Sequence, residues 1–97
     1  MLTGKQRSYL KSLANGLETA VYIGKNDLTE ATLAEMDDYL AAHELVKVKV
    51  QESCGLDVKE LANEAAGKLN AEFVQAIGRR FVLYKENKDK KTIELPR

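Results

Sequence analysis

Six residues near the middle of the chain, Leu45–Val50, alternate between aliphatic side chains and lysines. Successive side chains of a β-strand point to opposite faces of the sheet. The three valines of this segment would therefore lie on one face, and Lys47 and Lys49 on the other. The segment predicts a strand that turns an apolar face to a core and a basic face away from it.

The rest of the chain predicts the order helix, strand, helix, strand, helix, strand, strand. Thr3, Thr29 and Asp57 are good N-cap residues for the three helices. Gln6 and Glu60 follow the first and the last of these caps at the spacing of a capping box. The other strands are expected at residues 20–23, 72–77 and 81–84.

Strands that are separated by helices should pair in parallel, and the final hairpin, which turns at residues 78–80, must be antiparallel. The predicted fold class is therefore α/β (α+β), with a four-stranded mixed sheet and helices packed on it. A length of 97 residues fits one domain with one core. We expect that domain at residues 1–85, followed by a charged tail, 86–97, whose end has no regular structure.

Three features of the sequence favour a cytoplasmic protein. No apolar run approaches the roughly 18–20 residues that cross a bilayer, and the first residues lack the apolar stretch of a secretory signal. A lone cysteine, Cys54, cannot form a disulfide within the chain, which fits a reducing compartment.

The net charge is zero, but its distribution along the chain is uneven. Residues 1–25 carry four basic and one acidic side chain, residues 26–64 three and ten, and residues 65–97 eight and four. If the two ends meet in space, one face would be positive although the molecule is neutral, and such a face suits a phosphate backbone. An evenly solvated surface is the alternative.

No catalytic or metal site emerges from the sequence. Cys54 and His43 are eleven residues apart, and no pattern joins them to a third orienting group. One cysteine and one histidine cannot fill a four-ligand zinc shell without carboxylates, and the acidic residues fall chiefly on predicted helix surfaces. We therefore expect no enzyme and no cofactor, and a small hydrolase that uses Cys54 is the alternative.

The loop after the first predicted strand is a candidate phosphate site. It reads Gly24-Lys25-Asn26-Asp27 and leads into the helix that Thr29 caps. A helix N-terminus offers free backbone N–H groups at the positive end of the helix dipole, here beside a lysine. An ordinary strand–helix turn would have the same spacing.

Four segments, taken together and in order, resemble the CRM domain, whose name stands for chloroplast RNA splicing and ribosome maturation. The stand-alone bacterial form of this domain is the YhbY family. The resemblance covers residues 2 to about 85. The segments are Leu2–Arg7, Ile23–Asn26, Ala42–Val50 and Gln75–Tyr84.

The resemblance implies a fold similar to the C-terminal domain of translation initiation factor three, and a function in RNA binding. Bacterial members associate with precursors of the large ribosomal subunit, so ribosomal RNA is the implied partner, and we expect a monomer. The family's GxxG loop, held to contact the RNA backbone, falls on Gly24, Lys25, Asn26 and Asp27. Asp27 stands where the family usually has a second glycine, and its carboxylate would repel a phosphate.

Other basic side chains are candidate RNA contacts, although each could be an ordinary solvated charge. Tyr22 and Tyr84 could stack on bases if they are exposed. A protein–protein adaptor, docking a basic partner through the acidic helices without touching RNA, is the alternative function. The candidate basic residues are Lys5, Arg7, Lys11, Lys47, Lys49, Arg79, Arg80 and Lys85.

Overall fold

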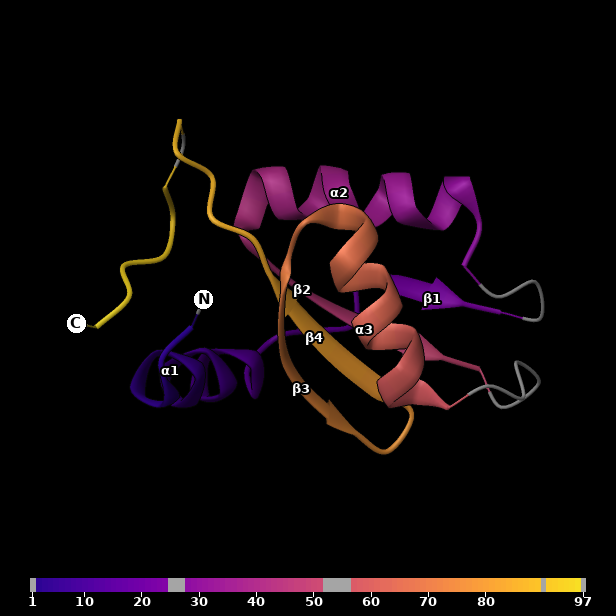
Figure 1. Ribbon diagram of the computed structural model, residues 1–97, viewed down its shortest axis with the longest axis horizontal. Coiled ribbons are helices and arrows are strands. Elements are labelled where there is room, and N and C mark those ends of the chain that lie inside the picture. Colours follow the sequence, from indigo (N-terminus) through magenta and orange to yellow (C-terminus); the bar gives the residue numbers. More distant parts are fainter. Residues whose placement is uncertain (1, 25–27, 52–56, 90, 97) are drawn as a thin grey trace.

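The computed structural model describes residues 2–24, 28–51, 57–89 and 91–96 of the chain. Within these ranges the helices and strands follow the predicted order (Figure 1). The predicted fold class, a single α/β domain with a four-stranded mixed sheet, is confirmed. The elements are α1 Gly4–Ala14, β1 Val21–Ile23, α2 Glu30–His43, β2 Leu45–Val50, α3 Val58–Leu69, β3 Glu72–Ile77 and β4 Arg80–Tyr84.

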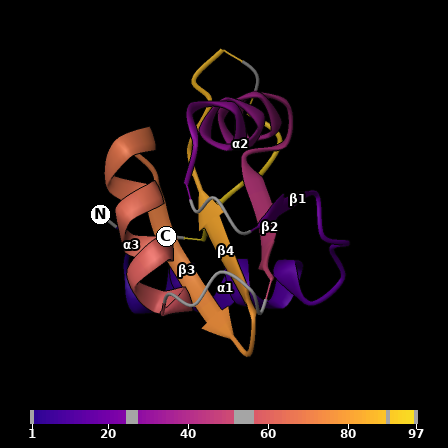
Figure 2. The same cartoon turned by 90° about the vertical axis from the view of Figure 1, so that its right-hand side faces the viewer.

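The strands lie in the order β1-β2-β4-β3, which Figure 2 shows from right to left. β1 and β2 are parallel, and β4 is antiparallel to both of its neighbours. The expectation that β2 and β3 would pair in parallel is wrong, because β4 lies between them. Phe81–Tyr84 are buried throughout, and a strand buried on both faces belongs inside a sheet, whereas β3 is only partly buried and takes the edge.

The two faces of the sheet carry separate clusters of buried side chains. On one face, the valines of β2 pack with Met36 and Leu40 of α2 and with Leu61 of α3. On the other, Leu10 and Ala14 of α1 pack with residues that include Leu45, Val74, Val82 and Tyr84. Figure 1 shows α3 crossing in front of the sheet and α2 running along its upper side. The sheet therefore separates α1 from α2 and α3.

The predicted helix starts are observed, with one difference. Thr3 and Gln6 form the predicted capping box, and Thr29 forms a second one with Thr32. Asp57 caps α3 by accepting from the amide of Lys59, one residue earlier than the capping box predicted with Glu60 requires. A carboxylate at each of those two positions would repel the other, which disfavours the reciprocal arrangement.

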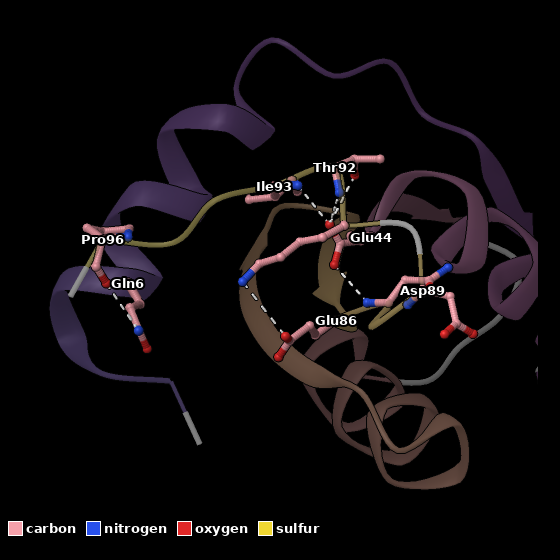
Figure 3. A network of polar contacts seen from close by, with 9 residues as sticks. Gln6, Glu44, Glu86, Asp89, Thr92, Ile93 and Pro96 are labelled. Carbon is pink, nitrogen blue, oxygen red and sulfur yellow. Dashed lines mark hydrogen bonds and ion pairs between the residues drawn. The ribbon is translucent and has the colours of Figure 1, made fainter.

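The described residues of the tail after β4 form no helix or strand, yet the tail folds back onto the domain (Figures 1 and 3). Ile93 and Leu95 pack against the cluster under α1, and the carbonyl of Pro96 accepts from the Gln6 side chain. Figure 3 shows Thr92 and Ile93 directed at Glu44, a fully buried carboxylate between α2 and β2. No short residue pattern predicts these contacts.

Candidate nucleic-acid interface

The basic side chains of the sheet lie on the face that α1 covers. Lys47 pairs with Val82, whose side chain belongs to the cluster under α1. Lys49 pairs with Arg80, two residues further along both strands and therefore on the same face. The strands contain a single acidic residue, Glu72, at the opposite end of β3. Its carboxylate accepts the backbone N–H of Leu2 at 2.9 Å. This half of the face is therefore positive, as the alternation of Leu45–Val50 predicts.

Helix α1 extends the positive charge around the edge of the sheet. It contains Lys5, Arg7 and Lys11 and no acidic residue. Arg7 and Lys11 line one wall of an open hollow of about 570 Å³ along β3, and Lys59 of α3 lies on the other wall.

A second hollow, of about 160 Å³, lies between Lys47 and Arg80 on the sheet. Gln75 and Ile77 line both hollows, so the basic residues of α1 and those of the sheet flank the same stretch of β3. We refer to Arg7, Lys11, Lys47, Lys49 and Arg80 together as the basic surface.

Negative charge gathers on the other side of the sheet. Helix α2 carries Glu30, Glu35, Asp37 and Asp38, all exposed, and contains no lysine or arginine. The fold thus separates the acidic middle of the sequence from the basic first helix, across the thickness of the sheet. A molecule of zero net charge has one positive side, which is the arrangement that the charge distribution anticipates.

Two residues at the centre of the basic surface are available to a ligand. Among the described residues, neither the Lys49 ammonium nor the Arg80 guanidinium has a hydrogen-bond or ion-pair partner. Lys47 is half-buried, and its Nζ donates to the carbonyl oxygen of Leu17 at 2.9 Å. Lys47 therefore also ties the segment after α1 to β2.

Two of the predicted contacts are engaged elsewhere in the structure. The Arg79 Nε donates to the carbonyl of Val50 at 3.2 Å, and its Nη2 donates to the carbonyl of Gln51 at 2.7 Å. Lys85 forms an ion pair of 3.1 Å with Asp37 of α2, on the acidic side. The structure therefore brings Lys85 away from the basic surface and binds Arg79 to the backbone.

The predicted phosphate loop is described only at its first residue. Gly24 follows β1 and lies near the side chain of Gln51, whose backbone carbonyl accepts from Arg79. Gln51 is held in place because its N–H donates to the carbonyl of Ile23 at 2.8 Å. Lys25, Asn26 and Asp27 lie outside the described residues.

Among the residues that line the two hollows, Lys59, Gln75 and Ile77 were not predicted as contacts. Gln75 reaches the face under α1 because a bulge in β3 shifts the register between Phe73 and Gln75. No residue pattern in this strand predicts such a bulge. The two tyrosines that could stack on bases differ, since Tyr22 is 55% exposed and Tyr84 only 3%.

The structure offers no support for a catalytic site in its described residues. The His43 ring packs against that of Tyr39 with 4.4 Å between centroids, and Cys54 lies outside the described ranges. Within those ranges, no group of three or more histidine, cysteine or acidic side chains could hold a metal ion. The described helices include none that is long and apolar enough to cross a membrane.

Comparison with known proteins decides the family. The model of the CRS1/YhbY (CRM) domain matches residues 2–85. The chain belongs to the CRS1/YhbY family. A relative in Bacillus subtilis, YqeI, is named a probable RNA-binding protein and is 38% identical over 96 residues, which cover 99% of this chain and all of YqeI. A Haemophilus influenzae relative, named an RNA-binding protein, is 41% identical over 96 residues, which cover 99% of this chain and 96% of the relative.

A solved structure supports the fold of this CRM domain. The solution structure of the Staphylococcus aureus protein SAV1595, a candidate RNA-binding protein, superposes with a TM-score of 0.82 at 41% identity. The match covers 99% of this chain and all of the other. CRS1/YhbY proteins are non-catalytic, so the chain is not an enzyme.

Proposed function

We propose that this CRM-domain protein binds RNA through the basic surface, and that the RNA is ribosomal RNA in precursors of the large ribosomal subunit. On this proposal the protein is a cytoplasmic monomer that aids ribosome assembly. The observation that carries RNA binding is that α1, β2 and β4 present five cations around one stretch of β3. The names of the relatives support it. The ribosomal target rests on the resemblance to the YhbY family.

The proposed mechanism is neutralisation of phosphates. Lys49 and Arg80, whose charged groups have no hydrogen-bond or ion-pair partner among the described residues, bind phosphate oxygens directly. Arg7 and Lys11 extend the contact around the edge of the sheet. Each neutralised phosphate releases condensed counterions, so affinity falls steeply as salt rises. The loop Gly24–Asp27 adds backbone donors on this proposal.

The test is the dependence of RNA affinity on salt between roughly 50 and 200 mM. Lys49→Gln and Arg80→Gln should each reduce the slope of log affinity against log salt by about one. Lys85→Gln is the matched control, since Lys85 pairs with Asp37 on the acidic side, and it should leave the slope unchanged. Binding that is indifferent to salt would overturn the proposed mechanism.

The exposed acids of α2 favour a second candidate, an adaptor that docks a basic ribosomal or assembly protein. Association with large-subunit precursors separates the two. The double variant Lys49→Glu with Arg80→Glu should lose that association if RNA is the partner. The double variant Glu35→Lys with Asp38→Lys should lose it if the acidic helix is the docking surface.

A further inference from the structure

One transverse row of side chains on the sheet is left open by α1. Tyr22 of β1 pairs with Lys49 of β2, Lys49 with Arg80 of β4, and Arg80 with Ile77 of β3. These four residues, the open row, cross the whole sheet on the face that α1 packs against. Strands are spaced roughly 4.8 Å apart, so the row is about 14 Å wide.

Helix α1 covers the neighbouring rows but ends before this one. Its buried residues Leu10 and Ala14 pack with Leu45, Val74 and Val82, which lie further from the hairpin turn. Asn15, at the end of the helix, borders the hollow that contains Arg80 and Ile77. The open row therefore has a helix beside it and none on top of it among the described residues.

The ends of the open row are large apolar side chains exposed to solvent. Tyr22 is 55% exposed and Ile77 is 65% exposed, and the one other exposed large hydrophobic among the described residues, Tyr9, is 38% exposed. Between them lie Lys49 and Arg80, whose charged groups have no hydrogen-bond or ion-pair partner among the described residues. An exposed aromatic beside unpaired cations has no role in the two cores, which lie elsewhere.

This pattern fits an unpaired nucleotide better than a duplex. A base in a duplex is stacked between its neighbours, so only an unpaired base can offer its face to an aromatic ring. Proteins that hold single strands combine aromatic platforms with cations that follow the phosphates. The strands bring no acid to this end of the face, since their only acidic residue, Glu72, lies at the far end of β3.

We infer that the open row is a platform for unpaired nucleotides of the bound RNA. Tyr22 stacks on a base, Lys49 and Arg80 bind the adjoining phosphates, and Ile77 packs against a further base or ribose. The inference rests on the proposed RNA-binding function and adds the class of RNA, a single-stranded segment. Tyr22 is then a residue that selects unpaired over paired RNA.

The experiment uses the full chain and two probes: a short single-stranded oligoadenylate containing 2-aminopurine, and the same strand annealed to oligouridylate. Stacking on Tyr22 should change the 2-aminopurine fluorescence on binding, and the single strand should bind more tightly than the duplex. Tyr22→Thr removes the ring and keeps a β-branched residue in the strand. It should weaken single-strand binding about 5- to 150-fold, the equivalent of 1–3 kcal/mol per stacked base.

Further variants separate stacking from charge and from folding. Tyr22→Phe retains the ring and should bind like the parent, whereas Tyr9→Ala removes an exposed tyrosine of α1 outside the row and should have no effect. Tyr22→Thr should leave the salt slope unchanged, because no cation is lost. Unfolding curves of Tyr22→Thr and Tyr22→Phe show whether a loss of affinity reflects a loss of fold.

The outcomes distinguish this inference from the proposed function. If Tyr22→Thr binds the single strand as tightly as the folded parent does, or if the duplex binds as well as the single strand, the inference is overturned and RNA binding stands. If the parent chain binds neither probe and no ribosomal RNA, the proposed function fails and the inference with it. Cross-linking from position 22 to a protein and not to RNA, in cells, would overturn the inference in favour of a docking surface.

Discussion

The carboxylate of Glu44 accepts the backbone N–H of Ile93 at 2.7 Å, and so joins the start of β2 to a residue 49 positions later in the chain. The same carboxylate accepts the N–H of Asn87 at 2.7 Å and both the N–H and the hydroxyl of Thr92. Glu44 is fully buried and has a left-handed backbone, with φ of 66°, at the C-cap of α2. A non-glycine residue in this conformation is disfavoured, so the hydrogen bonds offset a local cost.

Replacing Glu44 by glutamine should destabilise the fold by about 1.5–3 kcal/mol at neutral pH, because charged acceptors make the stronger hydrogen bonds. Burial acts to raise the pKa of Glu44, but the hydrogen bonds from Asn87, Ile93 and Thr92 outweigh it and lower the pKa below 4.5. A lowered native pKa gives stability that is present above the unfolded value and lost as pH falls through the native value.

The free energy of unfolding of the parent and of Glu44→Gln should therefore converge as the pH is lowered below about 4.5. Urea unfolding at a series of pH values measures this difference. Glu94→Gln, at an exposed position in the tail that Glu44 binds, is the matched control and should differ little from the parent at any pH. A difference between parent and Glu44→Gln that stays constant through the acid range would contradict the assignment.

Ending the chain after Lys85 should also destabilise the domain, by about 2 kcal/mol, because it removes the donors that hold Glu44 and the packing of Ile93 and Leu95. The two changes should not be additive. Once the tail is absent, Glu44→Gln should cost little, since the carboxylate has lost these partners. Additive losses in a double-mutant cycle would show that the tail and Glu44 act independently.

Replacing Tyr84 by phenylalanine should raise stability by about 1 kcal/mol, since the Tyr84 hydroxyl is buried and finds no hydrogen-bond partner among the described residues. Burial, together with the charges of Glu44 and Glu86, raises the pKa of Tyr84 to about 12. The raised pKa gives stability that is present below the unfolded value near 10 and lost as pH rises toward about 12.

Thermal unfolding of Tyr84→Phe, compared with the parent up to alkaline pH, checks both expectations for this hydroxyl. The advantage of the variant should grow above about pH 10. Tyr22→Phe, at an exposed position, serves as the control and should be close to neutral throughout. A variant that is less stable than the parent by 1 kcal/mol or more, on the order of one hydrogen bond, would mean that the hydroxyl has a partner.

The sequence predicts local structure and the sign of a surface well, because both follow from short patterns. The alternation in Leu45–Val50 gives the orientation of Lys47 and Lys49 without any knowledge of the fold. Strand order is less accessible, since parallel crossovers allow β3 to lie beside β2 or one place further away. The buried run Phe81–Tyr84 is the feature that would have indicated a central β4.

Long-range pairing of individual side chains could not be predicted. In the sequence, Glu44 is indistinguishable from the other acidic residues near the second helix, and Lys85 from any basic residue after a strand. Only the fold brings Glu44 to Ile93 and Lys85 to Asp37. The open row depends on three strand registers and on where α1 ends, so Tyr22 alone gives no reason to choose it. Residues that act through neighbours distant in sequence are the ones that pattern analysis misses.

The neighbouring arginines of the β3–β4 hairpin should prove to have opposite roles. Arg79 donates to the carbonyls of Val50 and Gln51 and so holds the turn to the end of β2. Arg80, in contrast, is exposed and belongs to the basic surface. Arg79→Gln should lower the free energy of unfolding by about 1 kcal/mol, because a carbonyl pair loses a charged donor. Arg80→Gln should leave stability within about 0.5 kcal/mol of the parent, as surface substitutions usually do.

RNA binding should show the reverse order, with the salt slope of RNA affinity reduced by Arg80→Gln and unchanged by Arg79→Gln. Urea unfolding and RNA titration of both variants separate the two roles. An equal reduction of the salt slope of RNA affinity in Arg79→Gln and Arg80→Gln would show that Arg79 also reaches the phosphates.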